Sequence, residues 1–136
     1  MDVRHKAFTE ALESFSYLTE VDMAALATQL DKRLIDGLEN GKAQKFEYTL
    51  EFCWKAIKAA LKEQEGIDEA SPKKIVKARY LAEHLPEDDY LALIAAISDR
   101  NKLSHIYDAH EFTAIVNRLP GYAKLMQRVS KALYSG

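Results

Sequence analysis

The sequence has few of the residues that cross-link or interrupt a chain. Cys53 is the single cysteine, so no disulfide can form within the chain and nothing points to secretion. Only three prolines and five glycines occur among 136 residues, and almost none falls inside a segment with helical periodicity. This scarcity favours helices joined by short turns.

Long apolar segments and a strong net charge are missing as well. The longest apolar run, Tyr90 to Ile97, is far shorter than the roughly 20 residues that cross a bilayer, and the first residues contain no apolar core of a signal peptide. The net charge of −2 gives no broad attraction to nucleic acid, so RNA binding would need a local basic patch. We therefore expect a cytoplasmic protein with no membrane contact.

The composition is that of an ordinary globular protein, with 48% hydrophobic and 29% charged residues. A chain of 136 residues has the size of one domain and can bury one core. We predict a single helical domain over residues 1–136.

Apolar residues recur at helical spacing, and no segment alternates with the period of two that a strand requires. Gly37 and Asn40-Gly41 are expected to end one helix, Gly66 to end the next, and Pro120-Gly121 to break the last. Five or six helices with short turns predict an all-α, up-and-down helical bundle. The predicted helical stretches are residues 8–18, 23–38, 42–64, 72–84 and 108–134. A further helix is expected to begin at Pro86.

The stretch from Lys42 to Gln64 has apolar side chains on two sides. Tyr48 and Phe52 lie nearly opposite the main apolar stripe, at about 100° per residue. Such a helix is central in a bundle or shared with a second chain. Tyr48 and Phe52 are therefore candidates for a partner or dimer interface, and we expect a homodimer.

A polar stretch follows the apolar stripe of Tyr90 to Ile97 in the same helical phase. Because an unpaired buried charge is costly, we expect this face to be either a satisfied buried network or the wall of a cleft, and not solvated surface. The polar positions are Arg100, Asn101, Ser104, Tyr107 and Asp108.

His105 follows Arg100 by five positions, which on an ideal helix places the two side chains about 140° apart. They would converge if the helix loosened near Asn101, or if two copies met at a dimer axis. The pair could also be structural, with Asp99 or Asp108 pairing with Arg100.

Two blocks of the sequence resemble known families. Arg100-Asn101-Lys102-Leu103-Ser104-His105 resembles the signature of the HEPN superfamily, and Tyr107 extends it to the arginine–four–histidine–one–tyrosine form of HepT-like proteins. The segment Lys45-Phe46-Glu47-Tyr48-Thr49-Leu50-Glu51-Phe52-Cys53-Trp54-Lys55 is similar to a block of the nucleotidyltransferase substrate-binding proteins. Ser71-Pro72 follows where that family also tends to have it, and the resemblance covers roughly residues 41–134.

The resemblance implies a HEPN-like helical bundle that dimerises and partners a minimal nucleotidyltransferase. In that interpretation the chain belongs to a two-gene, toxin–antitoxin-like module and presents the Arg100-x4-His105-x-Tyr107 motif in a dimer cleft. The alternative is an active, metal-independent endoribonuclease toxin that uses Arg100 and His105 and is silenced by nucleotidylation of Tyr107. RNA is a candidate ligand in either case.

The residue types of the motif suit RNA cleavage without a metal or cofactor, and we expect neither. An unperturbed histidine titrates near pH 6.5, so His105 could accept and return a proton. Arg100 could clamp the phosphate as negative charge develops. Asn101 could orient the phosphate or the arginine, and Tyr107 could position the substrate.

Other polar groups have simpler interpretations. Glu51 is better explained by an ion pair with Lys55 than by a metal site shared with Glu47. Cys53 lies on the apolar stripe and is interpreted as inert core. One basic cluster could guide RNA, meet an acidic partner, or form the exposed face of an amphipathic helix, and we favour the last; its members are Lys73, Lys74, Lys77 and Arg79.

Overall fold

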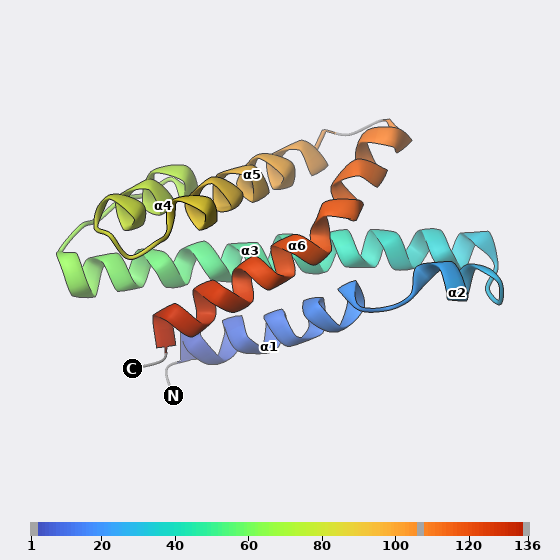
Figure 1. Cartoon of the computed structure of the whole chain (residues 1–136), viewed down its shortest axis with the longest axis horizontal. Coiled ribbons are helices and arrows are strands. Elements are labelled where there is room, and N and C mark those ends of the chain that lie inside the picture. The colour runs from blue at the N-terminus through green and yellow to red at the C-terminus, as the bar shows by residue number, and fades with distance from the viewer. Residues whose placement is uncertain (1–2, 106–107, 135–136) are drawn as a thin grey trace.

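The computed structural model describes residues 3–105 and 108–134 (Figure 1). These residues form six helices and contain no strand, which confirms the predicted all-α helical bundle. The helices are α1 (Val3–Thr19), α2 (Met23–Ala27), α3 (Lys32–Glu65), α4 (Pro72–Leu81), α5 (Glu87–Leu103) and α6 (Ala109–Tyr134).

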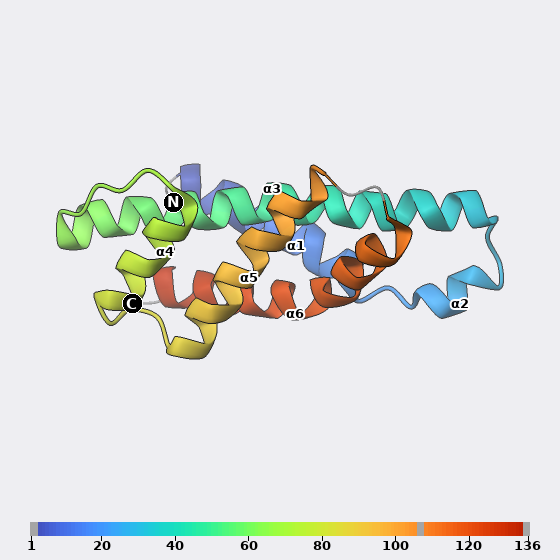
Figure 2. The same cartoon turned by 90° about the horizontal axis from the view of Figure 1, so that it is seen from above.

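The long helix α3 is the axis of the molecule and contacts each of the other five helices. Figures 1 and 2 show α2 beside one end of α3 and α4 beside the other end, with α1 and the second half of α6 beside the stretch between them. Helix α1 packs on α3 and α6 and makes no contact with α5. The interpretation of the stretch from Lys42 to Gln64, within α3, as a central helix of the bundle is therefore correct.

The core lies where α1, α3 and α6 meet. Phe46 of α3 is fully buried, with its ring centroid 5.9 Å from that of Phe15 in α1 and 5.4 Å from that of Tyr122 in α6. Offset aromatic pairs at such distances add to the free energy gained by burying their apolar surface. Phe46 thus ties three helices together.

The predicted end of a helix at Gly37 and Asn40-Gly41 is wrong, because α3 runs through both glycines. A glycine inside a helix costs only about 1 kcal/mol relative to alanine, which the hydrogen bonds and contacts of the surrounding turns outweigh. The break comes earlier, where the Asp31 carboxylate caps α3 by accepting a hydrogen bond from the Arg33 backbone N–H at 2.7 Å. At the other end Gly66, with φ of 66°, terminates α3 as predicted.

Replacing Gly37 and Gly41 together with alanine should raise the free energy of unfolding by about 1–2 kcal/mol, because both positions are helical and a new methyl group meets no atom within 4 Å at either one. Urea unfolding followed by circular dichroism measures the change. A loss of stability in the double variant would contradict a continuous α3.

The predicted break at Pro120-Gly121 is also wrong, since α6 continues through Pro120. A proline removes one helical hydrogen bond and its ring crowds the preceding turn, so a bend is the usual outcome. Figure 1 shows α6 changing direction partway along its length. Leu119 and Tyr122 are buried on either side of the proline, and their packing holds both halves of α6 against the core.

None of the helices in the described ranges combines the length and apolarity that a bilayer crossing requires.

Candidate functional site

The polar motif lies at the end of α5 and in the residues that follow it. Arg100 and Asn101 belong to the last turn of α5, and Ser104 is its C-cap. His105 comes next, with its backbone N–H 2.8 Å from the Lys102 carbonyl oxygen. Tyr107, the predicted modification site, lies outside the described residues.

The motif face is mostly exposed in a single chain. Asn101, Ser104, His105 and Asp108 are at the surface, and Arg100 is partly buried. The expected buried network or cleft is therefore not formed at Asn101, Ser104 and Asp108 by one chain alone. Ser104 and Asp108 lie beyond the end of α5, which stops at Leu103, so the helix does not carry them onto the core.

The buried polar network lies one residue earlier, at Asp99, which is only 5% exposed. Its carboxylate accepts hydrogen bonds from Arg118 Nε at 2.8 Å and Nη2 at 2.9 Å, and from the Tyr122 hydroxyl at 2.6 Å. Asp99 thus pairs with α6, and the interpretation in which it pairs with Arg100 is wrong. The network fixes the end of α5 to α6 beside the motif.

The protonation states of this network are stable near neutral pH. Burial disfavours the charged form of Asp99, but hydrogen bonds from Arg118 and Tyr122 outweigh it and hold the pKa of Asp99 below its ordinary value. Burial, followed by the hydrogen bond to Asp99, raises the pKa of Tyr122 to about 12. Asp99 is therefore ionised and Tyr122 neutral when they meet Arg118.

Arg100 carries an unused donor. Its Nε atom is buried and has no hydrogen-bond partner within residues 3–105 and 108–134. A buried donor without an acceptor costs about 1–3 kcal/mol, and more when the group is charged. A second chain or an anionic ligand could supply the missing acceptor, because a guanidinium is suited to phosphate and carboxylate oxygens.

Tyr48 and Phe52 lie on the outer side of α3, away from its main buried stripe. Tyr48 is 52% exposed, and Phe52 packs partly against the core. Together with Ala7 and Ala11 of α1 they line a shallow groove of about 360 Å³. Because α1 does not touch α5, the structure does not bring this groove together with the motif.

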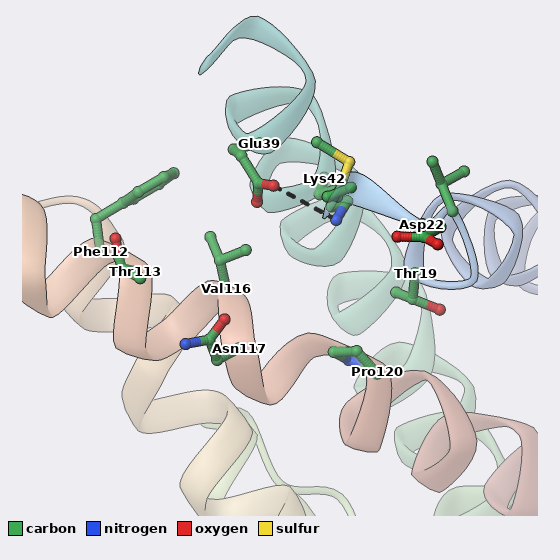
Figure 3. Close-up of a pocket in the computed structure, with 11 residues that line it drawn as sticks. Thr19, Asp22, Glu39, Lys42, Phe112, Thr113, Val116, Asn117 and Pro120 are labelled. Atoms are coloured by element: carbon green, nitrogen blue, oxygen red, sulfur yellow. Dashed lines mark ion pairs between the residues drawn. The ribbon is translucent and has the colours of Figure 1, made fainter. Parts of the chain in front are cut away.

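A cavity of about 510 Å³ separates the first half of α6 from α3 and the α1–α2 connection (Figure 3). Lys42, only 8% exposed, lies here with its Nζ atom 3.7 Å from Glu39 Oε1. Glu39 Oε2 is buried and unpaired among the described residues. No local sequence pattern indicates the pair of Glu39 and Lys42, because Lys42 follows Asn40-Gly41, which resembles a turn. Arg100 and His105 of the motif do not line this cavity.

Two simpler predictions, on Glu51 and on Cys53, are confirmed. Lys55 pairs with Glu51 at 3.3 Å, as expected. Cys53 is fully buried in the core, and burial raises the pKa of its thiol to about 12, as expected of an unreactive side chain. Among the described residues, no three histidine, cysteine or acidic side chains gather as metal ligands.

The predicted basic cluster is only partly exposed. Lys73, Lys74 and Lys77 are at the surface of α4, in agreement with an amphipathic helix. Arg79 does not join them, because it is buried and donates a hydrogen bond to Gln64 Oε1 at 2.8 Å. Its role is to join α4 to the end of α3.

The chain is similar in sequence and structure to a protein whose crystal structure is known. That protein, from Thermus thermophilus, shares 29% sequence identity, covers 93% of this chain and 98% of its own, and superposes with a TM-score of 0.80. No curated protein matches significantly. The family model described as nucleotidyltransferase substrate binding protein like matches residues 4–135. Since this match spans almost the whole sequence, the chain belongs to the nucleotidyltransferase substrate binding protein like family.

Proposed function

We propose that this chain is the helical partner subunit of a minimal nucleotidyltransferase in a two-gene, toxin–antitoxin-like module. The observation that carries the proposal is the family match over residues 4–135, since the family's name links it to substrate binding for a nucleotidyltransferase. The HEPN-like motif and the exposed groove on α3 supply two surfaces through which such a subunit could act.

The separation of these surfaces suggests different roles for them. The Arg100-x4-His105-x-Tyr107 motif would lie in a cleft between two copies of the chain, where the second copy covers Asn101 and supplies an acceptor for Arg100 Nε. The groove at Tyr48 and Phe52 would then bind the transferase, because a half-exposed tyrosine beside apolar surface is a typical interface anchor.

The alternative function is a metal-independent endoribonuclease toxin. The observation that favours it is an exposed His105 just over one turn after Arg100, whose Nε atom has no hydrogen-bond acceptor among the described residues. The RNA 2′-hydroxyl would attack phosphorus and give its proton to His105, while the bond from phosphorus to the 5′-oxygen breaks and that oxygen takes a proton from water. Arg100 would stabilise the charge on phosphorus, and nucleotidylation of Tyr107 would block RNA entry by charge and bulk.

An RNA cleavage assay separates the two functions. The purified chain is incubated with several RNAs in the presence of a chelator, alongside the variants His105→Ala and Arg100→Ala. The control is His110→Ala, which removes an exposed histidine outside the motif. The partner role predicts no cleavage by well-folded wild type. Cleavage that persists in His110→Ala and is lost in both motif variants would establish the endoribonuclease instead.

A further inference from the structure

A third hollow in the surface concentrates positive charge. It measures about 500 Å³ and lies between the first turn of α1 and the second half of α3. Four cationic side chains and one carboxylate line it, although the whole chain has a net charge of −2. The lining residues are Arg4, Trp54, Lys55, Lys58, Ala59, Lys62 and Glu63. We refer to it as the Trp54 pocket.

The indole ring in this pocket has a fixed position. Trp54 is partly buried and packs against the hydrophobic core, so one side of the residue is anchored while the rest stays accessible. The Nζ atom of Lys55 lies 5.8 Å from the centroid of the ring, and the ion pair with Glu51 holds Lys55 in place. The pocket therefore offers an aromatic surface, anchored on one side, next to cationic groups.

Two of the positive charges in the pocket are not balanced by the chain itself. Lys58 and Lys62 stand one turn apart on α3, where like charges repel, and neither has an ion-pair partner in the described part of the chain. Arg4 adds a third cationic side chain to the lining of the pocket, from the first turn of α1. A ligand with several negative charges would complement both helices.

We propose that the Trp54 pocket binds a nucleoside triphosphate, with the base against the indole of Trp54 and the phosphates among Lys58, Lys62 and Arg4. The volume is within the range of small-ligand sites, about 300–1,000 Å³. One ring fits one base, whereas proteins that bind single-stranded nucleic acid use several successive aromatic side chains. Binding of the nucleotide does not depend on the proposed function. Only its use, as a substrate of the partner transferase, rests on that function.

The pocket carries its own reporter, because Trp54 is the single tryptophan in the sequence. ATP titrated into the full chain should change the tryptophan fluorescence with a midpoint below about 1 mM, after correction for absorbance with free tryptophan. Inorganic triphosphate lacks the base and adenosine lacks the phosphates. Each should bind at least about tenfold more weakly than ATP, because base stacking and charge-assisted hydrogen bonds are each worth about that factor or more.

The double variant Lys58→Gln/Lys62→Gln tests the cationic groups. We expect at least about tenfold weaker ATP binding, since two charge-assisted contacts are lost. The matched control is Lys73→Gln/Lys74→Gln, which removes the same charge from exposed positions on α4 and should change the affinity by no more than about twofold. The variant Trp54→Leu lacks the fluorescent side chain, so its ATP binding is measured by calorimetry. Its affinity should fall by a factor similar to that of the lysine double variant. Circular dichroism checks that each variant is folded.

Several outcomes would overturn the proposal. They are no response to ATP at about 1 mM, an equal loss in the α4 control, inorganic triphosphate binding as tightly as ATP, or binding of a short single-stranded RNA without binding of ATP. A chain that forms a complex with the transferase but does not bind ATP would contradict this inference and leave the proposed function standing. A chain that binds ATP but forms no such complex would contradict the proposed function alone.

Discussion

Asp99→Ala should lower the free energy of unfolding by about 3 kcal/mol, because it removes the acceptor shared by Arg118 and the buried Tyr122 hydroxyl. The Arg118 side chain is 46% exposed, so water can replace part of what it loses. The loss of unfolding free energy should thus lie near the lower end of the range found when one partner of a buried ion pair is removed. Urea unfolding followed by circular dichroism measures it.

A matched control exists on the same two helices. Asp89 of α5 pairs with Arg128 of α6 at 3.0 Å, but no buried hydroxyl joins that pair in the described structure. Asp89→Ala should cost about 1 kcal/mol or less. Equal losses in the Asp99 and Asp89 variants would show that the Asp99 network has no special role in fixing α5 to α6.

The Asp99 network should also make stability depend on pH. The folded-state pKa of Asp99 is below its ordinary value of about 3.9, so its contribution is complete above that value and is lost as the pH falls through the lowered pKa. The difference in unfolding free energy between wild type and Asp99→Asn should therefore be larger at pH 7 than near pH 3. A difference that stays constant over this range would contradict an ionised, hydrogen-bonded Asp99.

Tyr48→Glu should weaken binding of the cognate nucleotidyltransferase by about 100-fold or more, because an interface anchor is lost and a charge must be desolvated in its place. Tyr48 is half-exposed, so the variant should still fold. The matched control is Tyr17→Glu, since Tyr17 is 70% exposed on α1 and does not line the groove at Tyr48 and Phe52. Calorimetric titration measures both, and equal affinities would remove the groove from the transferase interface.

Local signals in the sequence were enough to predict several helix ends. Ser71-Pro72 and Pro86 mark the starts of α4 and α5, and Gly66 marks the end of α3. The failures came where a local cost competes with packing. The costs of Gly41 in α3 and Pro120 in α6 are smaller than what continuous helices gain by placing Phe46 and Tyr122 in one core.

The motif could be placed after an apolar helical stripe from its sequence, but the end of α5 at Leu103 and the surroundings of the motif could not be predicted. Asp99 meets Arg118 and Tyr122 across two helices, and no local pattern specifies which arginine an aspartate selects. The same holds for the Trp54 pocket, which needs Arg4 from the first turn of α1 and Lys58 from α3. Such pairings depend on the crossing of helices, which a single sequence without related sequences does not reveal.

Light scattering after size exclusion at about 10 μM tests whether the chain partners a minimal nucleotidyltransferase. The masses to be measured are those of the chain, of the cognate transferase and of their mixture. The chain has a mass of 15.4 kDa, so the predicted homodimer would double it. We expect the mixture to elute as one species whose mass exceeds that of either protein alone. Two separate peaks with unchanged masses would contradict a partnership with the transferase.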